Sequence, residues 1–61
     1  MPVITIEAAK LNKEQKVRMS KEMTKIAAEV MQLPEQTIYV FIKENELDNI
    51  GVGGILLSDK K

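Results

Sequence analysis

A proline stands directly behind the initiator methionine of this chain, at the start of an apolar stretch. If Met1 is removed, the ring nitrogen of Pro2 becomes a secondary amine instead of part of an amide. A free α-amino group titrates at about 7.7–8.0, and burial beside other cations disfavours its charged form. Pro2 is therefore a candidate general base, a role that accelerates proton transfer by roughly 10²–10⁴-fold. The simpler interpretation is that Pro2 only fixes φ and removes a donor at the start of a strand.

The composition leaves few other groups for catalysis. The chain has 61 residues and contains no cysteine, histidine or tryptophan. These absences exclude thiol nucleophiles, Ser-His-Asp relays, thiolate zinc sites and disulfide frameworks. Acid-base chemistry must therefore use carboxylates, lysines, the single tyrosine or the amino terminus, and we expect no metal site.

The charge balance argues against nucleic acid or an anionic membrane as a partner. Nine Lys and Arg residues balance nine Asp and Glu residues, so the net charge is zero and no global basic field exists. The lone Tyr39 and Phe41 do not form a stacking platform for bases. The sequence has no signal-peptide pattern and no apolar run near the roughly 18 residues of a membrane span, so we expect a cytoplasmic protein.

Two periodic segments open the chain. Alternating side chains over residues 2–8 predict a β-strand that is apolar on one face. Asn12 is a predicted helix N-cap, with Gln15 as its capping-box partner. From about residue 13 to 32, apolar residues recur at three- and four-residue steps, which predicts an amphipathic helix: Met19, Met23, Ile26, Ala27, Val30 and Met31. Pro34 ends this helix because it biases the preceding residue away from α conformation.

A second apolar run, over residues 37–44, predicts another strand. Residues 38–42 are consecutive apolar or aromatic residues, typical of a strand covered on both faces. Strand, helix and strand form a β-α-β unit with parallel strands, but one helix covers only one face of so small a sheet. The other face, carrying either Tyr39 and Phe41 or the alternate residues of the run, must meet another subunit. A single domain of about 60 residues is also marginal without such burial.

The last third of the chain predicts a short β-hairpin. Residues 45–50 are polar and turn-like, and glycines at 51, 53 and 54 precede a short apolar run. Their spacing matches neither G-x-G-x-x-G nor the P-loop, so a turn between short strands is the better interpretation. Residues 58–61 form a polar end, either frayed or lying over a neighbour. We therefore predict an α+β fold with one domain spanning residues 1–61.

Four features, in this order, resemble the 4-oxalocrotonate tautomerase family. They are Met1-Pro2 at the start of a strand, Glu14-Gln15-Lys16 near the start of the helix, a β-rich run ending at Glu44, and Gly51-Val52-Gly53-Gly54 before a short strand. The resemblance covers nearly the whole chain. It implies a β-α-β subunit whose carboxy-terminal hairpin reaches onto a neighbour, usually in a hexamer built from dimers. It also implies a terminal proline that turns a 2-hydroxydienoate into its 2-oxo isomer, with no metal or organic cofactor.

The chain departs from the family at three positions that usually complete the pocket, two arginines and a phenylalanine. Lys10 in the first loop is the best candidate cation, although a solvated loop lysine explains it equally well. Tyr39 occupies the position of the second-strand arginine, where it either donates a hydrogen bond to a substrate oxygen or packs as an interface aromatic. Ile50 replaces the phenylalanine and is a candidate apolar wall. Because lysine cannot reproduce the two-pronged contact of arginine with a carboxylate, the usual dicarboxylate substrate is in doubt.

Two functions of different classes remain open. The first is a tautomerase with Pro2 as its base, acting on a small 2-hydroxydienoate or 2-oxo acid that carries one carboxylate or two. The second is a self-associating scaffold or binding module that keeps the fold without the activity. Loss of both family arginines favours the scaffold, whereas retention of Pro2 and the glycine turn favours the enzyme.

Overall fold

The computed structural model describes residues 1–60, which contain one long helix and four strands. In chain order these are β1 (Val3–Ala8), α1 (Lys13–Met31), β2 (Tyr39–Glu44), β3 (Gly51–Val52) and β4 (Ile55–Leu56). Short 3-10 helices lie at Glu35–Thr37, Leu47–Asn49 and Leu57–Asp59. This order confirms the predicted α+β fold. The predicted polar end lies partly in the last 3-10 helix, and Lys61 lies outside the described residues.

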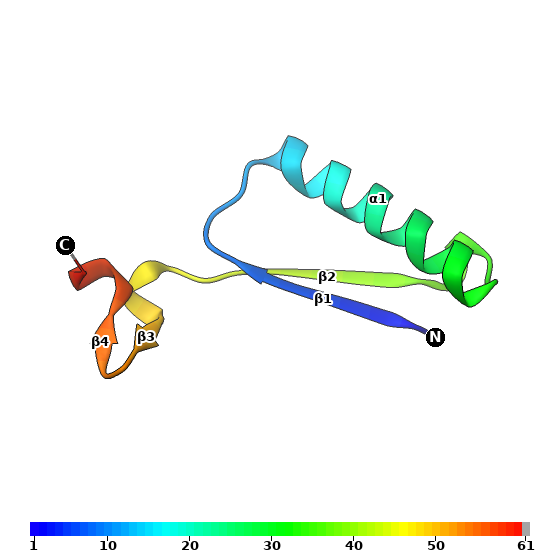
Figure 1. Cartoon of the computed structure of the whole chain (residues 1–61). Coiled ribbons are helices and arrows are strands. Elements are labelled where there is room, and N and C mark those ends of the chain that lie inside the picture. Colours follow the sequence, from blue (N-terminus) through cyan, green and yellow to red (C-terminus); the bar gives the residue numbers. More distant parts are fainter. Residues whose placement is uncertain (61) are drawn as a thin grey trace.

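β1 and β2 form a parallel pair that is covered on one face. The register sets Val3 opposite Tyr39, and α1 lies across one side of the pair while the other side is bare (Figure 1). Ile38, just before β2, is buried with 9% of its surface exposed, whereas Tyr39 and Phe41 are 50% and 52% exposed. The uncovered face predicted from the sequence is therefore the one that carries Tyr39 and Phe41.

The amino end of α1 carries the predicted capping box. The Gln15 N–H donates to Asn12 Oδ1 at 2.8 Å, and the Asn12 N–H donates to Gln15 Oε1 at 3.0 Å. These two bonds satisfy backbone donors that have no partner within the helix, and so they fix where the helix begins.

The carboxyl end of α1 lies at Met31, one residue before the predicted end. Gln32 adopts the left-handed conformation with φ of 58°. The Leu33 N–H donates to the Ala28 carbonyl at 3.1 Å. Because a left-handed residue cannot continue the helix, the stop is set by Gln32, two residues before Pro34.

The second strand begins at Tyr39 and not at Thr37, as the sequence pattern predicts. The Thr37 N–H and hydroxyl both donate to the Pro34 carbonyl, at 3.1 and 2.7 Å, within a 3-10 turn. A threonine hydroxyl that bonds the local backbone competes with strand pairing, which explains the shorter strand. β1 likewise begins at Val3, so Pro2 lies just outside it.

The single chain does not bury a core of its own. Across residues 1–60, Ile38 is the one buried hydrophobic side chain, and no residue of α1 is buried. The radius of gyration is 14.9 Å, against about 10 Å for a compact domain of this length. Part of the predicted apolar face of α1 is open, with Val30 73% exposed. The helix has a wider apolar surface than a two-stranded sheet can cover.

β3 and β4 form the predicted carboxy-terminal hairpin, with Val52 opposite Ile55 in antiparallel register. Gly53 and Gly54 make the turn, with φ of 62° and 86°. Glycine adopts these values without the steric cost that a side chain brings. The hairpin projects beyond the end of the sheet, away from α1 (Figure 1).

Candidate active site

Pro2 directly precedes β1, so it lies at the end of the strand nearest the amino terminus, which is marked N in Figure 1. Its carbonyl accepts a hydrogen bond from the Tyr39 N–H at 3.0 Å, which fixes it to the start of β2. Proline has no N–H, so its nitrogen takes no part in strand pairing. Met1 is 79% exposed. The residue whose removal would free the Pro2 amine is therefore accessible in the single chain.

Tyr39 lies at the same end of the sheet as Pro2. It stands opposite Val3 in the register, and its side chain is half exposed on the bare face. A phenol can donate a hydrogen bond to an oxyanion while its ring packs against apolar surface. The structure therefore brings the candidate base and one candidate donor together at the amino end of the strands.

Lys10 lies at the opposite end of the sheet, in the loop between β1 and α1. Its side chain is exposed. It lines a cavity of about 320 Å³ whose other lining residues are Ala9, Glu44, Asn45, Glu46 and Leu47. An ammonium group beside an open cavity can hold a carboxylate as a point charge.

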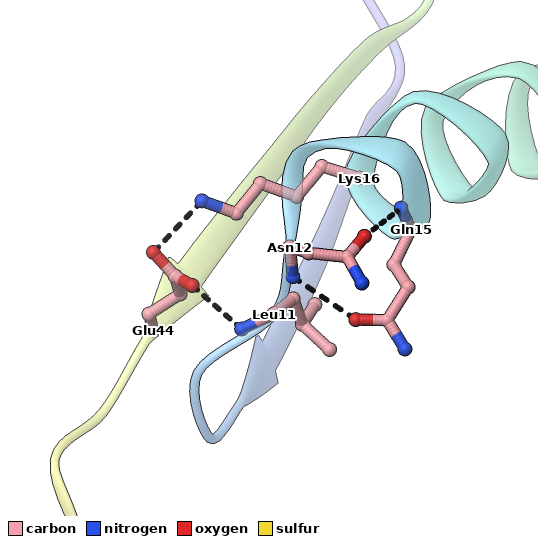
Figure 2. Close-up of polar contacts among 5 residues, drawn as sticks. All are labelled: Leu11, Asn12, Gln15, Lys16 and Glu44. Carbon is pink, nitrogen blue, oxygen red and sulfur yellow. Dashed lines mark hydrogen bonds and ion pairs between the residues drawn. The ribbon is translucent and has the colours of Figure 1, made fainter.

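Glu44 ends β2 and joins it to the loop and to the first turn of α1 (Figure 2). One carboxylate oxygen accepts from the Leu11 N–H at 2.7 Å, and the other accepts from Lys16 Nζ at 2.9 Å. The pKa of Glu44 is lowered from its usual value, first by the hydrogen bond from Leu11 and then by the one from Lys16. Glu44 is therefore ionised at neutral pH and ties the loop that carries Lys10 to the sheet and the helix.

Asn45 strengthens the same end of the sheet. Its N–H donates to the Ala8 carbonyl at 2.8 Å, and its Nδ2 donates to Glu7 Oε1 at 3.1 Å. The sequence pattern indicates Glu44 only as the end of a β-rich run and does not predict its contacts. No spacing in the sequence indicates them, because they depend on the parallel register, which sets Ala8 opposite Glu44 and so brings the loop after β1 beside that carboxylate.

Ile50 lies just before β3 and is half-buried. Its carbonyl accepts from the Leu57 N–H at 2.8 Å, so the residue is fixed to the returning chain. It lines a hollow of about 570 Å³ whose other lining residues are Glu7, Ala8, Ala9, Asn45, Leu47, Asn49, Gly51 and Leu57. Three of these residues also line the cavity beside Lys10, so the two hollows adjoin.

The four candidate residues thus form two groups at opposite ends of the sheet. Pro2 and Tyr39 lie at the amino end, and Lys10 and Ile50 lie beyond the carboxyl end. A six-residue strand such as β1 spans about 16 Å between its end residues at the usual rise of a parallel strand. A small dienoate does not bridge that distance, so one subunit alone does not bring all four residues to one substrate.

The sequence and fold are matched by known proteins. The family model described as "Tautomerase enzyme" matches residues 2–60. This chain belongs to the tautomerase family. A relative named as a probable tautomerase, from Listeria monocytogenes serotype 4b (strain F2365), is 32% identical over 60 residues, which cover 97% of this chain and 98% of the relative.

Solved structures of tautomerases share the subunit fold. YwhB, described as a homologue of 4-oxalocrotonate tautomerase, has a TM-score of 0.91 and 31% identity, covering 98% of this chain and 100% of that chain. A heterohexameric 4-oxalocrotonate tautomerase from Chloroflexus aurantiacus J-10-fl has a TM-score of 0.89 and 22% identity, with 100% of both chains covered. The second likeness concerns the fold alone. The resemblance predicted from the sequence is therefore confirmed at the level of the tautomerase family.

The part of the chain that the structure describes contains neither a metal-binding cluster nor a membrane-spanning helix. No group of three or more Asp, Glu, His or Cys side chains gathers there as a metal site would require. No helix in that part is both long and apolar enough to span a membrane.

Proposed function

We propose that this protein is a cofactor-independent tautomerase whose general base is the amine of Pro2, freed by removal of Met1. The observation that carries the proposal is the position of Pro2. Its carbonyl is held by the Tyr39 N–H at 3.0 Å, while its nitrogen lies outside the strand pairing at the open end of the chain. Membership of the tautomerase family supports the same class of reaction.

The reaction moves one proton within a small 2-hydroxydienoate. The neutral amine of Pro2 takes the proton of the enol hydroxyl, and the electrons of that O–H bond form the 2-oxo group as the double bonds shift. The protonated amine then returns the proton to a carbon at the end of the shifted system. Atoms and charge balance without a further reactant, and a base whose pKa lies near the working pH suits both halves of the transfer.

Negative charge on the substrate oxygens has to be met by donors and cations. Tyr39 supplies a phenol donor beside Pro2. Lys10 supplies a cation and Ile50 an apolar wall, but in the same subunit both lie at the far end of the sheet. We therefore place the complete site between subunits, where Lys10 and Ile50 come from neighbours of the subunit that provides Pro2.

Open apolar surfaces support an assembly of this kind. The outer edges of the two-stranded sheet are unpaired within residues 1–60, and the bare face and α1 expose large side chains such as Phe41 and Val30. An open groove of about 560 Å³ is lined by Ile6, Ala8, Leu11, Gln15, Arg18, Met19 and Glu22. The proposed assembly is a hexamer, in keeping with the heterohexamer described for the Chloroflexus relative. The proposed location is the cytoplasm.

A substrate with one carboxylate fits this chain better than a dicarboxylate. Lys10 offers a single point charge, and Tyr39 offers a hydrogen bond without charge. Neither gives the planar two-pronged contact that arginine makes with a carboxylate. We expect a monocarboxylate dienol such as phenylenolpyruvate to be turned over with a lower KM than 2-hydroxymuconate.

The decisive experiment uses the protein expressed from its own first codon. Intact mass reports whether Met1 has been removed, and ketonisation of both substrates is then followed against pH. We expect the rate to rise through one ionisation below about 7.7, the lower end for a free α-amino group. Pro2→Ala should lose this activity while the oligomer, measured by light scattering, is unchanged.

The runner-up function is a non-catalytic scaffold or binding module on the same fold. The observation that favours it is the absence of both family arginines: the first loop offers Lys10 and no arginine, and Tyr39 occupies the second-strand position. A scaffold would assemble normally with Met1 removed and would turn over neither substrate faster than buffer. That outcome would replace the enzymatic proposal.

A further inference from the structure

We infer that Glu44 is a positioning residue for substrate binding, because it holds the loop that presents Lys10 to the substrate carboxylate. The inference rests on the proposed function, since Lys10 has this role only if the protein binds such a substrate. Its basis is the junction of three elements in Figure 2, where the end of β2 meets the loop after β1 and the first turn of α1.

The backbone on both sides of Lys10 is fixed to the β2 end. After it, the Leu11 N–H donates to Glu44 Oε2 at 2.7 Å. Before it, the Ala8 carbonyl accepts from the Asn45 N–H at 2.8 Å. Hydrogen bonds to an ionised carboxylate are roughly twice as strong as neutral ones. Lys10 therefore lies in a short segment of backbone that is hydrogen-bonded at both ends, at one of them to the Glu44 carboxylate.

Lys16 orients this carboxylate. Its Nζ lies 2.9 Å from Glu44 Oε1, and both side chains are about one-third exposed. An ion pair at this exposure contributes little to stability by itself. Its effect is directional, because holding one carboxylate oxygen leaves the other facing the Leu11 N–H.

The Lys10 ammonium stays outside this ion pair. Within residues 1–60, Lys16 with Glu44 is the pair closer than 4 Å, and Lys10 has no carboxylate at that distance. The same carboxylate fixes the backbone beside Lys10 and pairs directly with Lys16, whereas Lys10 acts on it only through space, as the last of the charges that lower its pKa. This division leaves the Lys10 ammonium open to a substrate.

The helix side of the loop is fixed independently. The capping box between Asn12 and Gln15 sets the start of α1 through bonds of 2.8 and 3.0 Å, and neither bond involves Glu44. Loss of the Glu44 carboxylate should therefore release the backbone at Leu11 without unwinding α1. A displacement of about 1 Å at a binding group is enough to cost up to about 10²-fold in rate.

The first test is Glu44→Ala, assayed as the assembled protein with 2-hydroxymuconate. We expect KM to rise about tenfold, as loss of one hydrogen bond to a charged group predicts. The kcat value and the pH inflection that belongs to Pro2 should stay unchanged, because the base lies at the other end of the strand. A native KM for this variant would overturn the inference.

Two matched variants separate geometry from charge. Glu44→Gln keeps an oxygen that accepts from the Leu11 N–H, so its KM should stay within about threefold of native. Glu29→Ala makes the same truncation and charge change on the exposed face of α1, and it should leave KM unchanged. A rise for Glu29→Ala equal to that of Glu44→Ala would overturn the inference, because charge alone would then explain it.

A double-mutant cycle tests whether Glu44 acts through Lys10. In a Lys10→Ala background, Glu44→Ala should add almost nothing to KM, because the group it positions is gone. An equal rise in both backgrounds would overturn the inference. Failure of the proposed function is a different result, a native protein without turnover.

Hydrogen exchange at the Leu11 amide tests the contact without any assay of activity. Glu44→Ala should accelerate exchange at this amide while the amides of α1 stay protected. Unchanged protection at Leu11 would overturn the inference even in an inactive protein.

Discussion

The two ends of the parallel sheet are held in opposite ways. At the amino end, a single backbone bond of 3.0 Å from the Tyr39 N–H holds Pro2, and the Pro2 nitrogen is left out of strand pairing. At the carboxyl end, Glu44 and Asn45 tie strand, loop and helix together with bonds of 2.7–3.1 Å. An amine that takes and returns a proton needs a free lone pair, whereas a cation that only holds a substrate needs a fixed position. In the proposed function, the same strand pair would meet both needs, one at each end.

Loss of the base at the amino end should have the largest effect. Pro2→Ala should lower kcat by about 10²–10⁴-fold, because the variant's primary amine is no longer held in position by the proline ring. KM and the oligomer should change little, in contrast to Glu44→Ala, which should change KM. Steady-state ketonisation of 2-hydroxymuconate measures both constants. Equal losses of kcat in the two variants would remove the distinction between the ends.

Tyr39→Phe sharpens the comparison within the amino end, since it keeps the ring and removes only the hydroxyl. We expect kcat to fall about tenfold, equivalent to about 1.4 kcal/mol of transition-state stabilisation. Tyr39→Ala is the control, because it also removes the ring from the bare face. If Tyr39→Phe is fully active and Tyr39→Ala falls apart into smaller species, the residue is an interface aromatic.

Asn12→Ala should destabilise the start of α1, at the carboxyl end of the sheet, without changing the catalytic rate. Loss of the cap on the Gln15 N–H should lower the free energy of unfolding by about 1 kcal/mol, measured by urea denaturation. Asn12→Ser keeps a side-chain oxygen for the same donor and should recover most of that loss. The kcat value should match native in both, and a large fall in kcat would show that the two ends are coupled.

The smallest expected effect is the contribution of Glu44 ionisation to the pH dependence of the free energy of unfolding. Its pKa is lowered in the folded protein below the ordinary 4.5, so its ionised form favours folding above that value. This contribution is lost as pH falls through the lowered pKa, which gives a small extra loss of stability below about pH 4.5. Glu44→Gln cannot titrate, so the difference in midpoint between native and variant should shrink as the solution is acidified. A constant difference would mean that the carboxylate contributes no proton linkage.

The features that were predictable from the sequence depend on residues close together in the chain. Asn12 and Gln15 are three residues apart, and the predicted capping box is confirmed. The glycine turn at Gly53 and Gly54 is equally local, because positive φ is a property of the residue itself. The start of β2 was predicted less accurately, because the Thr37 hydroxyl donates to the Pro34 carbonyl three residues earlier.

The features that were missed join distant residues. Glu44 accepts from Leu11, 33 residues earlier, and from Lys16, 28 residues earlier. No spacing in the chain announces these bonds until the parallel register is known. The sequence also did not determine which face of β2 the helix covers, the face with Tyr39 or the opposite face, which continues from Ile38. Alternation defines two faces, and only the packing of α1 against the sheet selects one of them.

The roles of Pro2, Tyr39, Lys10 and Ile50 stay predictions. The structure gives the positions of these residues within one subunit, but the chemistry depends on which ends of which subunits meet. That arrangement involves contacts between chains, and neither local patterns nor a single subunit contains them.

With Ile38 as the one buried hydrophobic side chain in residues 1–60, an isolated chain has little to hold it in shape. Folding and encounter between chains should then be a single event. Refolding after dilution from denaturant should follow second-order kinetics, with a rate that rises in proportion to protein concentration, and the thermal midpoint should rise with concentration as well. A newly synthesised chain would therefore reach its native form only as fast as it associates with other subunits.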